Sequence, residues 1–144
     1  MRHKSSAGIL GCLLLTVVAG CAAPHGNDPN RASCYYQVVL GRMGGSTGAT
    51  VTARCDPSPS AFSMALELKY APPIPFQNEW HTKATTPPDT RIPDSNGLTY
   101  SVVNTVCLIG VWRVEAHAKG TNPDGTDMGP ISLGYDPRRA ELCQ

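Results

Sequence analysis

The sequence predicts an all-β fold, a small disulfide-tied antiparallel β-sandwich, with a small barrel as the alternative. Seven short strand-like segments follow one another, and two of them alternate strictly between apolar and polar residues. Thirteen prolines and 14 glycines interrupt the chain too often for long helices. Of the 144 residues, about 124 remain if a leader of 20 is removed, which suffices for one domain with a modest core.

The first 21 residues read MRHKSSAGILGCLLLTVVAGC and have the layout of a secretory signal. Arg2 and Lys4 form a positive head, and an apolar run over residues 9–18 follows. A bilayer span takes about 20 apolar residues, so this run is too short to serve as a membrane helix. We therefore expect export from the cytosol.

Val18-Ala19-Gly20-Cys21 resembles the lipobox of bacterial lipoproteins. The resemblance implies cleavage before Cys21, a diacylglycerol on its thiol, and acyl chains such as palmitate that hold the protein on the extracytoplasmic side of the cell membrane. Two or more chains anchor a protein stably. The alternative is an ordinary secretory signal cut near Ala22 or Ala23, with Cys21 incidental. The expected organisation is a signal peptide over 1–20, a lipidated flexible tether over 21–33, and a sandwich domain over 34–144.

The strand assignments rest mainly on a period of two. In residues 61–70, Phe62 and every second residue after it are large and apolar, which predicts a half-buried strand rather than a helix. Residues 111–119 alternate in the same way, with Trp112 facing inward and His117 outward. The other expected strands are Cys34–Leu40, Ala49–Cys55, Gln77–Thr82, Leu98–Cys107 and Ile131–Tyr135. Residues 85–97 are rich in proline and polar residues and should form a long loop.

Four cysteines follow the leader and the tether, in a compartment that permits disulfides. Cys34 and Cys55 flank two strand-like segments with a glycine-rich midpoint, so a hairpin would bring them face to face. Cys107 and Cys143 likewise flank a unit centred on Gly125. We predict the pairs Cys34–Cys55 and Cys107–Cys143. An inter-sheet Cys55–Cys107 bond is the alternative, and the absence of a Cys-x-x-Cys pair disfavours zinc.

The paired cysteines and the segment Cys107-x-x-Gly110-Val111-Trp112-Arg113 make the layout similar to small immunoglobulin-like envelope proteins of actinobacteria. This resemblance implies a fold and a location in the envelope. It implies no activity.

The residues predict neither an enzyme nor a cofactor or metal site. Gly44-Gly45-Ser46-Thr47-Gly48 matches the letters of a nucleophile elbow, but that motif needs a strand–turn–helix in a large α/β sheet. The oxygen-rich residues 122–127 are explained by a type I turn better than by calcium. Twelve basic residues against 11 acidic ones do not make the basic stripe of a nucleic-acid-binding protein.

Phe76, Trp80 and His81 follow a proline-rich bend and form the candidate recognition surface. The alternative is that Trp80 belongs to the core, since a small sandwich needs its few large aromatic residues inside.

These features together predict a membrane-anchored, non-catalytic binding module of the cell envelope, with an envelope protein or a glycan as its partner. The alternative is a small protein inhibitor, either of a protease or of a receptor in the manner of phage-encoded lipoproteins. Residues 85–97 or Cys107-Leu108-Ile109-Gly110 would then present the inhibitory loop.

Overall fold

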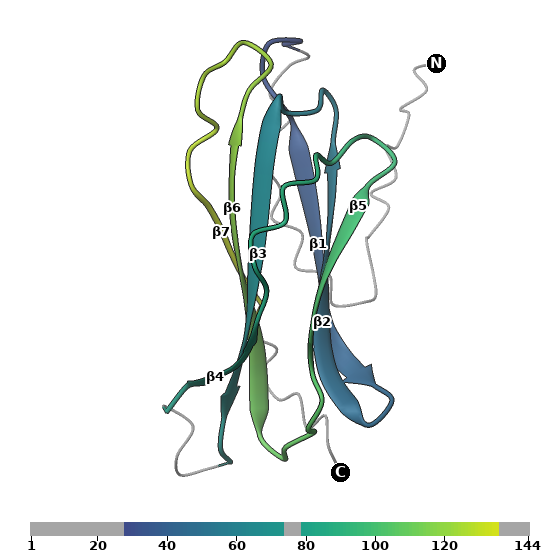
Figure 1. Cartoon of the computed structure of the whole chain (residues 1–144), viewed down its shortest axis with the longest axis vertical. Helices are drawn as coiled ribbons and strands as arrows, with labels where there is room; N and C mark the ends of the chain where they lie inside the picture. The colour runs from purple at the N-terminus through teal and green to yellow at the C-terminus, as the bar shows by residue number, and fades with distance from the viewer. Residues whose placement is uncertain (1–27, 74–78, 136–144) are drawn as a thin grey trace, which may run out of the picture.

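A computed structural model describes residues 28–73 and 79–135, and these residues form a β-sandwich without a helix (Figure 1). The strands are β1 (Cys34–Met43), β2 (Ser46–Cys55), β3 (Ala61–Ala71), β4 (His81–Thr85), β5 (Leu98–Asn104), β6 (Val111–Thr121) and β7 (Ile131–Tyr135). One sheet has the order β1-β2-β5 and the other β4-β3-β6-β7, with every neighbouring pair antiparallel. The predicted fold class is confirmed.

The first hairpin has the register that the cysteine spacing predicted. Cys34 pairs with Cys55 at its open end, and Met43 pairs with Ser46 at its tip. Gly44 lies in the turn with a φ of 65°, a conformation that glycine adopts without the steric penalty of a Cβ. The glycine-rich segment therefore closes the hairpin, and Ser46 begins a strand rather than the helix that a nucleophile elbow requires.

The core lies between β3 and β6 on one side and β2 and β5 on the other. Phe62, Met64, Leu66 and Leu68 of β3 are at most 4% exposed, which confirms the alternation predicted from the sequence. Trp112 of β6 is fully buried, with its ring centroid 5.1 Å from that of Tyr70. Because side chains alternate across a strand, the polar residues between these positions form the outer face of the four-stranded sheet.

β4 is displaced from its predicted position. The sequence predicted a strand over Gln77–Thr82, whereas β4 begins at His81 and extends to Thr85, the first residue of the expected loop. Its pairing with β3 shifts between Leu68 and Lys69, and such an irregularity breaks the simple alternation on which the prediction relied. β4 also pairs with β3 rather than with β5. In a constant-type immunoglobulin domain the fourth strand lies in the same sheet as the first, second and fifth strands, whereas here it lies in the opposite sheet.

The β6–β7 turn is built as a hydrogen-bonded turn, as predicted. The amide of Gly125 donates to the carbonyl oxygen of Asn122 over 2.9 Å, and the amide of Thr126 donates to Oδ1 of Asp124. The side-chain oxygen of Asn122 accepts a hydrogen bond from the amide of Ala32 at 3.0 Å. The last part of the expected tether is thus held against this turn.

The predicted signal peptide, the lipidation site Cys21, Phe76 and Cys143 lie outside the described residues. Within the ranges that the structure describes, no helix is long and apolar enough for a membrane crossing.

Candidate binding surface

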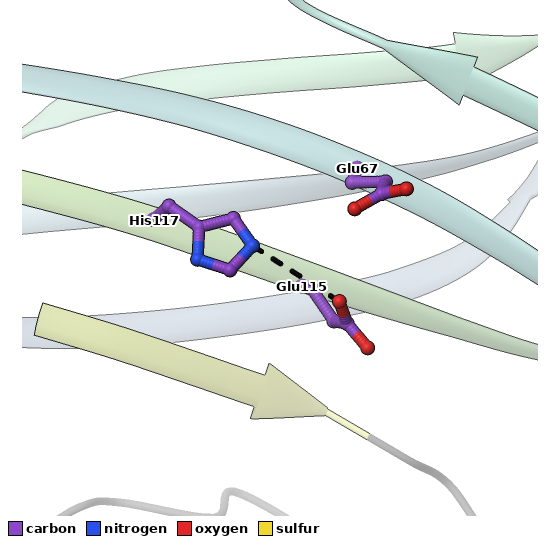
Figure 2. Close-up of side chains that lie close together, drawn as sticks. All are labelled: Glu67, Glu115 and His117. Carbon is purple, nitrogen blue, oxygen red and sulfur yellow. Dashed lines mark ion pairs between the residues drawn. The ribbon is translucent and has the colours of Figure 1, made fainter. Parts of the chain in front are cut away.

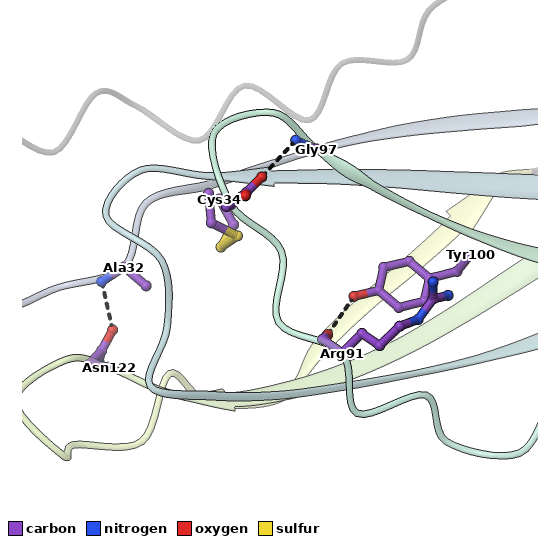
Figure 3. Close-up of a disulfide and its surroundings, with 8 residues drawn as sticks. Ala32, Cys34, Arg91, Gly97, Tyr100 and Asn122 are labelled. Atoms are coloured by element: carbon purple, nitrogen blue, oxygen red, sulfur yellow. Dashed lines mark hydrogen bonds between the residues drawn. A yellow bond between two sulfur atoms is a disulfide. The ribbon is translucent and has the colours of Figure 1, made fainter.

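The disulfide Cys34–Cys55 joins the start of β1 to the end of β2, as predicted (Figure 3). The amide of Cys55 also donates to the carbonyl oxygen of Asp94, so the long β4–β5 connection is attached at this end of the sandwich. Figure 3 also shows the hydroxyl of Tyr100 donating to the carbonyl oxygen of Arg91, over 3.0 Å. The end of the sandwich at which β1 begins is therefore tied by a disulfide and by hydrogen bonds.

Cys107 is also in a disulfide. Its predicted partner, Cys143, lies outside the described residues, so the pairing Cys107–Cys143 stays a prediction. Because Cys34 and Cys55 bond to each other, the alternative pair Cys55–Cys107 is excluded.

Trp80 lies on the outer face of the four-stranded sheet and is not part of the core cluster. Its ring is half-buried, and the guanidinium carbon of Arg113 lies 4.2 Å from the ring centroid. A cation at this distance is attracted to the ring face. His81 is exposed at the start of β4. Of the three predicted recognition residues, the structure thus places two near the surface, and Phe76 is not described.

Beside Trp80, the outer face carries a network of ion pairs. Nζ of Lys69 lies 2.7 Å from a carboxylate oxygen of Glu115 and 3.4 Å from one of Glu67. Arg113 pairs with the other oxygen of Glu115 at 2.6 Å. The hydrogen bond from Lys69, together with the charge of Arg113, holds the pKa of Glu115 below its ordinary value. Each carboxylate of this cluster therefore already has a cationic partner.

Glu67, Glu115 and His117 bring three potential metal ligands together (Figure 2). Their ligand atoms lie within 4.8 Å of one another, and Nε2 of His117 is 4.0 Å from Glu115. A cation bound there would have to displace the ammonium group of Lys69, which occupies the space between the two glutamates. The cluster is best described as an ion-pair network of the sheet.

Two shallow hollows accompany the described part of the sandwich, of about 320 and 310 Å³. Neither has a histidine or a cysteine among its lining residues. In the first, Asp89 is engaged by Arg91, and Tyr100 donates to a backbone carbonyl. The lining residues of these hollows thus bring no nucleophile next to a histidine base, the arrangement typical of nucleophilic catalysis.

The most distinctive surface feature is the connection between β5 and β6, residues 105–110, which we call the β5–β6 loop. Three of its backbone carbonyls accept hydrogen bonds from side chains of the neighbouring strands or their ends. The donors are Asn104, Trp112 and Tyr70, and the acceptors are the carbonyl oxygens of Val106, Leu108 and Ile109 respectively. The loop backbone is therefore attached to both sheets.

Two further contacts hold the same loop. Oγ1 of the fully buried Thr47 lies 3.3 Å from Sγ of Cys107, and the hydroxyl must donate because this sulfur is in a disulfide. Gly110 approaches the end of β3 so closely that an added Cβ would lie 2.4 Å from the carbonyl oxygen of Ala71 and 2.5 Å from the Tyr70 ring. A glycine is needed at such a close approach.

The side chains that this loop presents are aliphatic and exposed. Val106 is 55% and Ile109 is 62% exposed, and Val103, near the end of β5, is 47% exposed. The pairings Thr47↔Asn104 and Ala71↔Val111 place the loop beside the tip of the first hairpin, at the end opposite the Cys34–Cys55 disulfide (Figure 1). A loop fixed by hydrogen bonds thus exposes apolar side chains at the end of the domain opposite the start of β1.

The sequence named Cys107–Gly110 only as a candidate inhibitory loop and gave no reason to prefer it. The signal that could have singled it out is the absence of polar turn residues from Val106 to Ile109, in contrast to the polar connections over residues 86–97 and 122–130.

Comparison with known proteins adds no relative. No family model matches the chain, and neither a curated protein nor a solved structure is significantly similar to it.

Proposed function

We propose that this protein is a lipid-anchored, extracytoplasmic binding module of the cell envelope, non-catalytic, whose β5–β6 loop contacts a protein partner. The observation that carries the proposal is that the loop backbone is hydrogen-bonded to the neighbouring strands while Val106 and Ile109 are exposed. Exposure of apolar side chains to water is unfavourable, and a role in binding a partner explains it. A loop already fixed in place loses little conformational entropy on binding.

The position of the loop supports the same proposal. In a lipoprotein cleaved before Cys21, the anchor would precede β1 and attach to the disulfide end of the sandwich. The β5–β6 loop would then face away from the membrane, toward other envelope components. Lipid anchoring would also raise the effective concentration of membrane partners, so that a small contact could suffice.

Aliphatic side chains favour a protein over a glycan as the partner. Sugar rings stack on open aromatic faces, whereas the ring of Trp80 is already covered on one side by Arg113. The side chains of Val106 and Ile109 have no hydrogen-bonding groups and suit an apolar protein surface.

The test uses the full-length tagged chain in its own envelope, with a membrane-impermeant crosslinker applied to intact cells. The wild type should form an adduct of one defined additional mass. The double variant Val106→Asp, Ile109→Asp should lose it, because a carboxylate would have to be desolvated in the contact. Ile92→Asp is the matched control, since Ile92 is 47% exposed on the β4–β5 connection at the other end. An adduct that persists in the double variant, or that Ile92→Asp also abolishes, would refute the proposal that the β5–β6 loop contacts the partner.

The same loop gives a protease inhibitor as the second candidate, because it is rigid and includes a disulfide-bonded cysteine. This candidate expects stoichiometric inhibition of a protease in a panel assay, lost in Ile109→Asp and kept in Ile92→Asp. Cleavage of the loop without inhibition would exclude it.

A further inference from the structure

The β1 strand is an outer strand of the three-stranded sheet, and half of its backbone groups face away from β2. The Cα atoms of Cys34 and Cys55 are 4.1 Å apart, close to the ~4.5 Å spacing of a non-hydrogen-bonded antiparallel pair. The amide of Asp56 donates to the carbonyl oxygen of Ser33 over 2.9 Å, so the odd-numbered residues bond to β2. The residues whose N–H and C=O groups point to the open edge are therefore Tyr36, Val38 and Leu40.

No segment of the described chain hydrogen-bonds to these edge groups. β1 is ten residues long and has no charged residue from Cys34 to Gly41. On its outward side Tyr35 is 43% and Val39 is 50% exposed. A long, uncharged and partly apolar edge of this kind is a template for another strand.

The edges of the four-stranded sheet are different. β4 and β7 have five residues each. β4 carries His81 and Lys83, its pairing with β3 is irregular, and Pro130 precedes β7. Short length, charge, bulges and proline are the devices by which proteins block edge-to-edge pairing. They are present on both edges of the four-stranded sheet and missing from residues 34–41 of β1.

We propose that the β1 edge pairs antiparallel with β1 of a second copy, giving a two-fold dimer with a continuous six-stranded sheet. When Val38 lies on the two-fold axis, the core-facing side chains of both copies stay on one face of the joined sheet and the exposed ones on the other. Tyr36 is then opposite Leu40 of the second copy, and Tyr35 is opposite Gly41. Residues 34–42 of both copies pair.

Charge and symmetry favour a second copy as the occupant. A self-pairing edge meets its own residues, so a charged edge would repel itself. The one charge on β1 is Arg42, and the two copies of it would lie at opposite ends of the ladder, about 27 Å apart. Pairing of β1 with β1 of a second copy also gives a closed dimer. Pairing of β1 with β5 of another copy would leave one edge free on each copy, so that further copies could add without limit.

The test is thiol crosslinking of the full-length protein in its membrane. Val39→Cys places a thiol on the outward face of β1, next to the proposed axis. Val103→Cys is the matched control on β5, where Val103 is 47% exposed on the same sheet. With a short bis-maleimide, Val39→Cys should shift to twice the monomer mass, and Val103→Cys should stay monomeric, although both are confined to the membrane equally.

Three results would overturn the proposal. Val39→Cys could remain monomeric, or both variants could crosslink to the same extent, as random collision would give. A Val39→Cys adduct whose mass is not twice that of the chain would show that the edge binds a different protein. A charge on the edge gives an independent check, because Val39→Lys should lower the dimer fraction in analytical ultracentrifugation and Val103→Lys should not.

Discussion

At the residue scale, two tyrosines of the interior differ in one hydrogen bond. Burial raises the pKa of both Tyr36 and Tyr100 to about 12. The hydroxyl of Tyr100 donates to the carbonyl oxygen of Arg91, whereas that of Tyr36 is buried without a partner among the described residues. A buried hydroxyl that loses its bond to water and gains none opposes folding.

The two Tyr→Phe variants should therefore differ in their effect on the free energy of unfolding. Tyr36→Phe removes an unsatisfied hydroxyl and should leave the free energy of unfolding unchanged or raise it. Tyr100→Phe removes a formed hydrogen bond and should lower it by about 1 kcal/mol. Urea unfolding at neutral pH measures both. A larger loss for Tyr36→Phe than for Tyr100→Phe would show that the Tyr36 hydroxyl is satisfied.

Glu115 makes stability depend on acid pH. Lys69 and Arg113 hold its pKa below the ordinary 4.5, so in the unfolded chain it takes up a proton at a higher pH than in the folded one. Its contribution is present above pH 4.5 and is lost as the pH falls through the folded-state pKa. The wild type should lose more stability than Glu115→Gln between about pH 5 and 3. Parallel pH profiles for the two proteins in urea unfolding would contradict this.

At the scale of elements, the β5–β6 loop depends on the close approach of Gly110 to the end of β3. Gly110→Ala would place a methyl group 2.4 Å from the carbonyl oxygen of Ala71. The loop would have to shift, at a cost of about 1–3 kcal/mol, as is typical of overpacking. Gly45→Ala is the matched control, because an added Cβ there meets nothing within 4 Å. Thermal unfolding should separate the two variants, and equal melting temperatures would show that the loop is loosely held.

Elements with a regular pattern were predictable, and irregular ones were not. The alternation from Phe62 to Leu68 and around Trp112 predicted β3 and β6, because both strands have one buried face. The position of β4 was wrong because the strand is short, exposed and irregularly paired. The sequence did not single out the β5–β6 loop as the contact surface, because the loop is held by Tyr70 and Thr47, which are distant from it in sequence.

At the scale of the whole molecule, the two ends of the sandwich are chemically different. One end is tied by Cys34–Cys55 and by hydrogen bonds to the β4–β5 connection and the β6–β7 turn. The other presents the β5–β6 loop with its exposed aliphatic side chains. Spacing alone predicted the Cys34–Cys55 hairpin, but the gathering of loops at one end depends on strand order, which the sequence pattern does not encode. The proposed lipid anchor and the proposed contact surface would lie at these two different ends.

Export and lipidation of the chain are the premises of the proposed function, and intact-mass analysis of the native protein, with and without reduction, tests both. We predict a chain that begins at Cys21, carries the added mass of acyl chains, and gains four hydrogens on reduction of two disulfides. A protein that begins at Met1, with free thiols and no acyl mass, would contradict the anchor, the compartment and the proposed function together.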